Sequence, residues 1–212
     1  MQEGIFAVYK QKGITSNEAV MKIKKSFGGK KVGHAGTLDP LAEGVLVVGV
    51  GREATKNLSV FVQKEKEYEA VVKLGTQSET DDEEGVKKDV PPLNIPDSDK
   101  IKKALKNFEG VIEQTPPFYS AVKVNGKEAY KRIRKGEKFK LKPRKVFVEK
   151  IDLIDYCWPN LELRITTGPG VYIRSIARDL GDFLETAGYL KSLKRNRVGS
   201  YTIEDSFELN NL

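Results

Sequence analysis

The spacing of apolar residues along the chain predicts a mixture of strands and helices. Short apolar or alternating stretches predict strands over residues 5–9, 45–50, 67–74, 146–156 and 161–166. Apolar positions at helical spacing predict helices over residues 16–27, 52–62, 97–108 and 172–186, with a shorter helix at 127–135 and a basic hairpin or strand at 190–201. The elements follow no strict strand–helix repeat. We therefore expect an α+β fold on a mixed sheet rather than an all-parallel one.

The most constrained segment covers residues 33–44 and reads Gly-His-Ala-Gly-Thr-Leu-Asp-Pro-Leu-Ala-Glu-Gly. Its glycines permit positive φ or the close approach of a partner, and Pro40 fixes φ directly after Asp39. The apolar run 45–50 follows at once. A loop of this kind, entering a buried strand, can hold one side chain rigidly at the edge of a sheet. We predict that Asp39 is that side chain.

Composition limits the class of protein. A chain of 212 residues can bury a sizeable core, and we expect one domain. Cys157 is the only cysteine and His34 the only histidine, so neither an internal disulfide nor a zinc site is expected. The N-terminus lacks a leader-like apolar segment, and no run approaches the roughly 18 apolar residues of a membrane span. We expect a soluble, cytoplasmic protein without metal or cofactor.

The net charge of +7 is unevenly distributed. Residues 122–150 contain twelve Lys or Arg against three Glu, interleaved with aromatic residues Tyr130, Phe139 and Phe147. A second basic cluster comprises Lys191, Lys194, Arg195 and Arg197. A single charge run is usually a solvated face, but two separated clusters favour a long polyanion such as RNA.

A polar, acidic and proline-bearing segment covers residues 75–96, and we predict that it is a surface loop. Its run of four acids, residues 81–84, lacks the alternating oxygen ligands and the late Glu of a calcium loop. We therefore expect solvated carboxylates rather than a metal site.

Few residues are left as candidates for catalysis. The sequence contains no phosphate-binding loop, dinucleotide-binding turn, nucleophile elbow or Cys–His pair. What remains is Asp39, Tyr68 on a predicted strand, and Arg174 near the start of a predicted helix. A carboxylate, a phenol and an arginine can together carry out a covalent or oxocarbenium-type reaction at a sugar carbon without a cofactor.

Six motifs in order resemble those of bacterial tRNA pseudouridine-55 synthases, over nearly the whole stretch from Phe6 to Phe207. They are residues 33–44 with 51–56, Lys66-Glu-Tyr-Glu-Ala, Leu74-Gly75, Gln114-Thr-Pro-Pro-Phe-Tyr-Ser-Ala-Val-Lys, Val171-Tyr-Ile-Arg-Ser-Ile-Ala-Arg-Asp-Leu-Gly and Leu193-Lys-Arg-Asn-Arg-Val-Gly. The resemblance implies a largely antiparallel central sheet flanked by helices. It also implies an enzyme that detaches the T-loop uracil of tRNA, rotates it and rejoins it through carbon.

The resemblance also assigns roles to the candidate catalytic residues. Asp39 is the nucleophile, attacking either the base or the ribose anomeric carbon, and the sequence does not choose between these routes. Arg174 pairs with Asp39, and such a pair favours the ionised carboxylate. Tyr68 stacks on the target base and accepts the proton from its C5.

Further positions match residues around the substrate in that family. His34 enters the space that the flipped base vacates, or alternatively is a hydrogen-bonded histidine that holds the loop. Tyr172 and Leu193 wall the uracil pocket, although the pattern alone places both in the core. Lys10 and Lys56 match basic positions near the active site, where phosphate contact and loop support are both open. Asp82 matches an acid close to the pocket, and a solvated loop residue would look the same.

Departures from the family concern Tyr9, Gln11 and the pair Lys194-Arg195, which we assign to the rim of the site. Residues 118–145 match a mobile basic insertion that folds over the RNA. The sequence ends soon after Phe207, where most relatives continue into a small RNA-binding domain, so we expect only a catalytic domain, a monomer without an obligate protein partner. Two alternatives stay open: a relative of the catalytic subunit of guide-RNA pseudouridylation complexes, and a non-catalytic tRNA-binding or tRNA-folding module.

Overall fold

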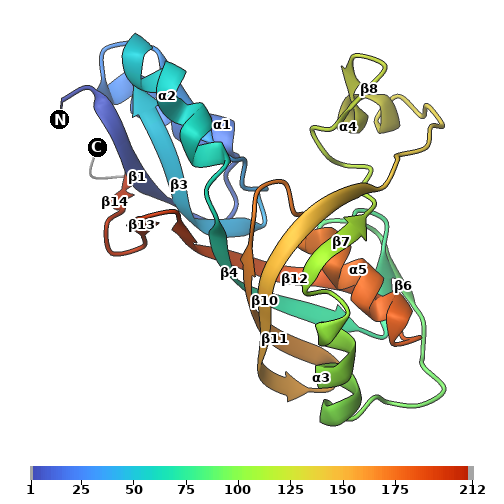
Figure 1. Ribbon diagram of the computed structural model, residues 1–212. Coiled ribbons are helices and arrows are strands. Elements are labelled where there is room, and N and C mark those ends of the chain that lie inside the picture. Colours follow the sequence, from blue (N-terminus) through green and yellow to red (C-terminus); the bar gives the residue numbers. More distant parts are fainter. Residues whose placement is uncertain (1, 210–212) are drawn as a thin grey trace. The chain divides into compact units, whose positions relative to one another are not determined.

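The computed structural model describes residues 2–209, which divide into two compact units. Unit 1 comprises the described parts of Met1–Glu69, Ile165–Pro169 and Leu193–Leu212, and unit 2 comprises Ala70–Arg164 and Gly170–Ser192. Three strands contribute residues to both units: β4 (Lys66–Leu74), β11 (Asn160–Thr167) and β12 (Gly188–Val198). Figure 1 labels helices and strands of both units and colours them along the sequence.

Unit 1 is built around β3 (Ala42–Val50), which is flanked in the order β14-β1-β3-β12. The other elements of unit 1 are β1 (Gly4–Lys10), α1 (Ser16–Ser26), β2 (Val32–Ala35), α2 (Arg52–Val62), β13 (Tyr201–Thr202) and β14 (Phe207–Glu208). Strands β1 and β2 pair with β3 in antiparallel fashion, whereas β12 is parallel to it. The buried run 45–50 is confirmed as part of this central strand.

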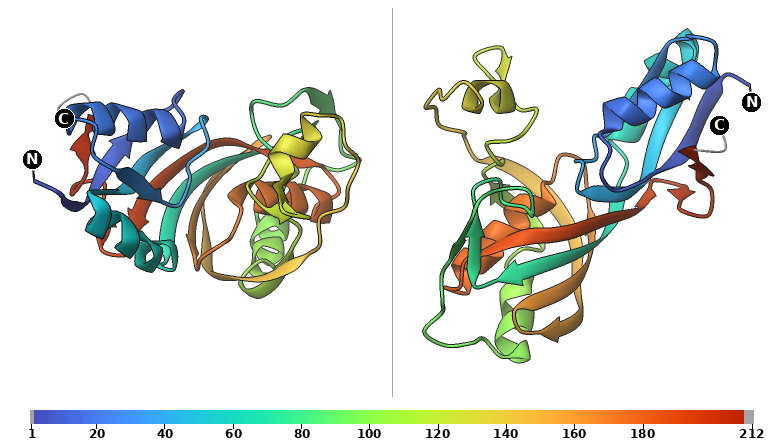
Figure 2. Two further views of the ribbon diagram at one scale, coloured as in Figure 1. Left: turned by 90° about the horizontal axis from the view of Figure 1, so that it is seen from above. Right: turned by 180° about the vertical axis from the view of Figure 1, so that it is seen from behind.

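Both faces of β3 are covered, which explains its uninterrupted apolar sequence. Leu46, Val48 and Val50 pack in one cluster with Ala19 and Ile23 of α1. Val45 and Val47 pack in another cluster with Leu58 of α2. Because successive side chains of a strand point to opposite faces, α1 and α2 cover opposite sides of this layer (Figure 2).

Helix α1 starts where its sequence predicts. The backbone N–H of Glu18 donates to Thr15 Oγ1 at 3.0 Å, and the backbone N–H of Thr15 donates to Glu18 Oε2 at 2.7 Å. This reciprocal capping box satisfies two N–H groups that the helix leaves unpaired. The predicted cap is confirmed, and it fixes the orientation of the helix whose first residue, Ser16, contacts the Asp39 loop.

Unit 2 contains strands in the order β12-β4-β11-β10-β7, with α5 and α3 among its helices. Its further elements are β5 (Thr76–Ser78), β6 (Lys87–Asp89), α3 (Ser98–Lys106), β7 (Gly110–Gln114), β8 (Lys123–Val124), β9 (Lys127–Glu128), α4 (Ala129–Ile133), β10 (Arg144–Cys157) and α5 (Ile173–Phe183). The basic segment holds the small hairpin β8–β9 and the short helix α4. The expected α+β fold on a largely antiparallel sheet is confirmed.

The prediction that residues 75–96 are only a surface loop is wrong. Strands β5 and β6 pair within this segment, and the side chains of Ser78 and Asp82 are buried. The polar composition of this segment predicts exposure to solvent, but hydrogen bonds and an ion pair compensate the burial of these two side chains.

No helix within residues 2–209 is long and apolar enough to cross a membrane.

Candidate active site

Asp39 lies, half-buried, in the connection between β2 and β3, and its backbone is fixed from several sides. The Ser16 hydroxyl donates to the Leu38 carbonyl at 2.9 Å and accepts from the Leu38 N–H at 2.9 Å. The Gly13 N–H donates to the Pro40 carbonyl at 2.8 Å, and the Ala42 N–H donates to the Asp39 carbonyl at 3.0 Å. Hydrogen bonds to residues outside the loop therefore hold both neighbours of Asp39, Leu38 and Pro40.

Arg195 of β12 contacts the first residue of this loop and the strand that follows the loop. Its side chain is 1% exposed, and it donates from Nε to the Val45 carbonyl at 2.8 Å and from Nη2 to the Gly36 carbonyl at 3.0 Å. The assignment of Arg195 to a basic surface cluster and to the rim of the site is therefore wrong. A charge count does not distinguish a buried arginine from an exposed one, so the sequence pattern offered no signal for this role.

The close approach of β12 to β3 requires a glycine at position 44. Gly44 pairs with Arg195 in the parallel ladder and has a φ of +107°. A Cβ at this position would lie 2.2 Å from the Arg195 carbonyl oxygen. Gly44 thus permits the strand contact that brings the Arg195 side chain to the Asp39 loop.

Two buried lysines add positive charge to unit 1. Lys10 is 0% exposed, and its Nζ donates to the Ile14 carbonyl at 2.7 Å and to the Gln11 carbonyl at 3.0 Å. Burial lowers the pKa of Lys10 to about 8, and the charge of Asp39 is the strongest influence that opposes this shift. Lys10, predicted near the active site, therefore interacts electrostatically with Asp39.

Lys66, at the start of β4, was not among the predicted site residues. Its Nζ donates to the carbonyls of Val62 at 2.9 Å and Lys64 at 2.6 Å, at the end of α2. Burial, followed by the charge of Arg195, lowers the pKa of Lys66 to about 8. The motif containing Lys66 was visible in the sequence, but only the structure shows that this cation is desolvated.

His34 lies on β2 opposite Val48 of β3. Burial, followed by the charge of Arg195, lowers the pKa of His34, so the imidazole is neutral at pH 7. Its Nδ1 is buried, and none of residues 2–209 supplies a hydrogen bond to that atom. The ring therefore keeps an unused polar atom beside the loop that carries Asp39.

The remaining predicted residues of unit 1 have different environments. Tyr68 is 6% exposed on β4, within a strand that alternates as predicted. Leu193 of β12 is half-buried and pairs with Ala42, three residues after Asp39. Lys56 is exposed on α2. The register thus brings Leu193 near the Asp39 loop, whereas Lys56 lies on the surface of a helix.

Unit 2 contains Arg174, in the first turn of α5 and 5% exposed. Its Nη1 lies 3.3 Å from Asp82 Oδ2, and its Nη2 donates to the Tyr119 carbonyl at 2.9 Å. Asp82 is 2% exposed, which excludes the alternative interpretation of this position as a solvated loop residue. The buried ion pair and the further bonds that Asp82 Oδ1 accepts from Thr80 Oγ1 and the Glu84 N–H explain how this carboxylate tolerates burial.

One turn later, Arg178 makes a parallel set of contacts. It lies 2.8 Å from Asp81 Oδ2 and donates from Nη2 to the Thr115 carbonyl at 2.9 Å. Burial raises the pKa of Asp81, and the charge of Arg178 opposes this rise. Arg174 and Arg178 therefore connect α5 both to the acidic hairpin segment and to the chain that enters the basic insertion.

Tyr172 precedes α5 and is held by Gln114. The Tyr172 N–H donates to Gln114 Oε1 at 2.8 Å, and Gln114 Nε2 donates to the Tyr172 carbonyl at 3.1 Å. The guanidinium carbon of Arg144 lies 5.1 Å from the centre of the Tyr172 ring. Arg174 and Tyr172 belong to unit 2 and Asp39 to unit 1, so the predicted pairing of Arg174 with Asp39 stays a prediction.

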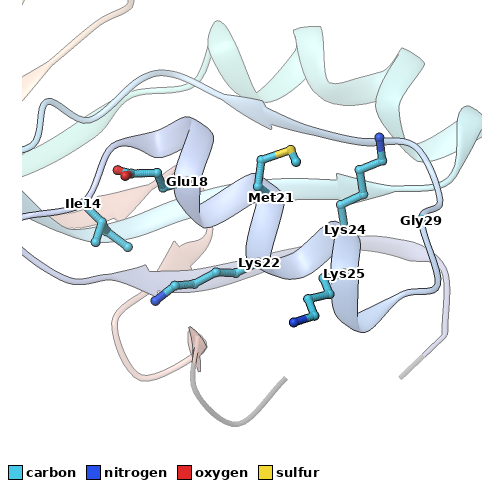
Figure 3. A pocket seen from close by; sticks show the side chains of 7 residues that line it. All are labelled: Ile14, Glu18, Met21, Lys22, Lys24, Lys25 and Gly29. Atoms are coloured by element: carbon cyan, nitrogen blue, oxygen red, sulfur yellow. The ribbon is translucent and has the colours of Figure 1, made fainter.

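A surface hollow of about 620 Å³ lies beside α1 (Figure 3). It is lined by Ile14, Glu18, Met21, Lys22, Lys24, Lys25 and Gly29. None of the nine predicted site residues lines it. Its three lysines surround a mostly apolar floor, and it is a separate feature from the Asp39 loop.

The chain is similar to proteins of one family. A family model described as "TruB family pseudouridylate synthase (N terminal domain)" matches residues 24–173. The tRNA pseudouridine synthase B of Thermobifida fusca is 43% identical over 220 residues, covering 100% of this chain and 75% of that protein. The protein of the same name from Corynebacterium diphtheriae is 40% identical over 219 residues, covering 99% of this chain and 72% of that protein.

Solved structures give a consistent result. A chain in the crystal structure of a Cbf5–Nop10–Gar1 complex is 30% identical with a TM-score of 0.78, and the match covers 100% of this chain and 54% of that one. A chain in the structure of an H/ACA RNP bound to a substrate RNA is 27% identical with a TM-score of 0.73, covering 99% and 52%. This chain thus spans about half the length of those solved chains. The resemblance that the six motifs predict is confirmed.

Proposed function

We propose a function from one premise: this chain belongs to the TruB family of pseudouridylate synthases. The family is enzymatic, and the prediction of an isomerase of this class is confirmed. The proposed reaction converts the T-loop uridine of tRNA, at position 55, to pseudouridine. The relatives named tRNA pseudouridine synthase B support tRNA as the substrate. With tRNA as substrate, we expect the enzyme to work in the cytoplasm.

One observation carries the proposal: the Asp39 loop is held at Gly36, Leu38 and Pro40 by side chains or backbone from outside it. A nucleophile gains most when its position is fixed before the substrate binds, because little entropy is then lost on reaching the transition state. The charge of Asp39 also opposes the burial-induced fall in the pKa of Lys10, so the carboxylate and this buried cation attract each other. These features support Asp39 as the residue that attacks the nucleotide.

The target base must leave its stack in the tRNA before Asp39 can reach it, which costs a few kcal/mol. In the proposal, His34 occupies the vacated space, since a neutral imidazole can stack and can also hydrogen-bond through its unused Nδ1. Tyr68 and Tyr172 contact the base, Leu193 lines its pocket, and Arg174 keeps Asp39 charged. Asp82 positions Arg174 through their ion pair.

The basic insertion, residues 118–145, supplies a surface for the RNA backbone. Most of its Lys and Arg side chains are exposed, whereas its aromatic residues pack on one another and on arginine. The Arg132 guanidinium lies 4.8 Å from the centre of the Phe139 ring, and Phe118 meets Phe139 edge-on at 5.6 Å. The segment therefore has Lys and Arg side chains exposed to solvent around a few packed aromatic residues. Such an arrangement suits contact with RNA phosphates. Lys56, exposed on α2, is a further candidate for phosphate contact.

The test is to incubate the protein with an unmodified tRNA transcript and to map pseudouridine by carbodiimide treatment and mass spectrometry. The proposal predicts one pseudouridine, in the T-loop. A matched transcript with cytidine in place of that uridine should gain none. Modification elsewhere, with the T-loop uridine unchanged, would overturn the proposed substrate site.

A second candidate function is that of a catalytic subunit resembling those of guide-RNA pseudouridylation complexes, which would modify its target only with a guide RNA. The likeness to a chain of the Cbf5–Nop10–Gar1 complex is consistent with this candidate only as a family relationship. Pseudouridine formation on tRNA by the isolated chain decides against this candidate, and formation only after a guide RNA is added decides for it. A non-catalytic tRNA-binding module would bind and refold tRNA without forming pseudouridine under either condition.

A further inference from the structure

Arg144, the first residue of β10, is an arginine that forms no ion pair with a carboxylate of residues 2–209. Several other arginines in this part of the chain do form ion pairs, among them Arg132 with Glu137, Arg174 with Asp82, Arg178 with Asp81 and Arg197 with Glu65. No carboxylate of residues 2–209 lies within 4.0 Å of the Arg144 guanidinium. A fixed guanidinium without a counter-charge is able to bind an anion from outside the chain.

The guanidinium is held in place nonetheless. Its Nη2 donates to the Gly170 carbonyl at 2.6 Å, and its carbon lies over the Tyr172 ring at 5.1 Å. Its backbone pairs with Gln114, the residue that brackets Tyr172 through two hydrogen bonds. Arg144, Gln114 and Tyr172 therefore form one connected arrangement in unit 2. The restricted geometry lowers the entropic cost of binding a ligand there.

Most of the hydrogen-bonding capacity of Arg144 is unused. A guanidinium has five N–H donors, and the contacts within residues 2–209 use only Nη2. Nε is buried without an acceptor, which proteins rarely tolerate unless a partner is supplied in the functional state. The bond from Nη2 to Gly170 lies in an exposed position, so this edge of the guanidinium is open to a ligand.

We propose that Arg144 is a substrate-binding residue that supports one face of the Tyr172 ring and binds a backbone phosphate of the RNA next to the target uridine. This inference rests on the proposed function, since it takes Tyr172 as a wall of the uracil pocket. A phosphodiester fits because its oxygens match the planar fork of arginine, and because the nucleotide against Tyr172 necessarily has a phosphate on each side. The contact fixes the strand, and Tyr172 then receives the base.

The test compares Arg144→Gln, Arg144→Lys and a matched control, Lys102→Gln, on a T-arm stem-loop RNA. Lys102 is exposed on α3, in unit 2 but outside the basic insertion, and its replacement removes the same charge. Arg144→Gln should weaken binding at least about tenfold and reduce the slope of log K against log salt by about one. Arg144→Lys should restore the slope but only part of the affinity, because lysine keeps the charge and lacks the planar fork. Lys102→Gln should leave affinity within about twofold.

A substrate series separates binding from a purely structural role. Single methylphosphonate linkages remove the charge of one phosphate at a time. At the linkage that Arg144 contacts, the methylphosphonate should weaken binding by the wild-type protein. It should not weaken binding by Arg144→Gln any further, because that variant already lacks the contact. If every linkage affects both proteins equally, or if Lys102→Gln binds as weakly as Arg144→Gln, the inference is wrong. If the wild type forms no pseudouridine, the proposed function itself fails, which is a separate result.

Discussion

The Arg195 guanidinium donates to the Gly36 carbonyl at 3.0 Å, although the two residues are 159 positions apart. Through this bond and the one to Val45, a side chain of β12 holds the connection between β2 and β3. Asp39 lies inside that connection. The rigidity of the proposed nucleophile therefore depends on a residue near the other end of the sequence.

Gly44→Ala tests the close contact between β3 and β12 at Gly44 and Arg195. The new Cβ would lie 2.2 Å from the Arg195 carbonyl oxygen, so we expect a loss of at least about 4 kcal/mol or failure to fold. Gly13→Ala is the matched control, because Gly13 also has a positive φ, +92°, but open space around it. It should cost only about 1–2 kcal/mol. Denaturant unfolding measures both, and equal losses would show that the close contact is unimportant.

Ser16→Ala tests the clamp on Leu38. Ser16 is 2% exposed, and the change leaves the N–H and carbonyl of Leu38 without that partner. We expect a loss of about 2–3 kcal/mol in the free energy of unfolding. We also expect kcat to fall about tenfold with little change in KM, because Asp39 is the next residue. The exposed Ser26→Ala should change stability by less than about 0.5 kcal/mol. An unchanged kcat in Ser16→Ala would separate the clamp from catalysis.

Stability should rise with pH where Lys10 loses its proton. Burial lowers the pKa of folded Lys10 from 10.5 to about 8, so between these values the unfolded chain binds more protons than the folded one. The free energy of unfolding therefore increases with pH in this window, and below pH 8 the folded protein bears the full cost of the buried charge. Lys66, with its pKa lowered to about 8, contributes in the same direction.

Lys10→Met checks this sign. Its free energy of unfolding should increase less steeply than that of the wild type between pH 8 and 10.5. Lys12→Met removes an exposed lysine two residues away and should keep the wild-type slope. Identical slopes in Lys10→Met and the wild type would mean that Lys10 is not desolvated in the folded protein.

Charge on the basic insertion should control the salt dependence of tRNA binding. Replacing the exposed Lys135, Lys138 and Lys140 by Gln should reduce the slope of log K against log salt by about two to three. The same replacement at the exposed lysines beside the α1 hollow, Lys22, Lys24 and Lys25, removes equal charge from another surface. Equal slopes for the two triple variants would show that net charge, rather than the insertion, governs binding.

Local patterns predicted most of the fold. The run 45–50 was identified as a buried strand because helices on both faces demand continuous apolar residues. The capping box at Thr15 and the alternating burial along β4 are also predictable from the sequence, because both depend on residues that are close together in the chain. The Gly- and Pro-bearing loop around Asp39 is likewise a local feature of the sequence, whereas the rigidity of the Asp39 side chain stays a prediction.

Buried charges could not be predicted in this way. Arg195 and Asp82 are polar in sequence and buried in structure because partners distant in the chain compensate them. Whether such partners exist is a property of the tertiary fold, and composition carries no information on it. The ion pairs that Arg174 and Arg178 of α5 form with Asp82 and Asp81 depend on the tertiary structure, which places the acidic segment beside the helix.

The most direct test of the account is pseudouridine formation by Asp39→Asn. The change removes the nucleophilic charge and nearly preserves the shape of the side chain, so tRNA should still bind. The rate of tritium release from C5-labelled T-loop uridine should fall at least about a thousandfold. Asp152→Asn, on a partly exposed aspartate of β10, should keep the wild-type rate. A wild-type rate in Asp39→Asn would contradict the assignment of Asp39 as the nucleophile.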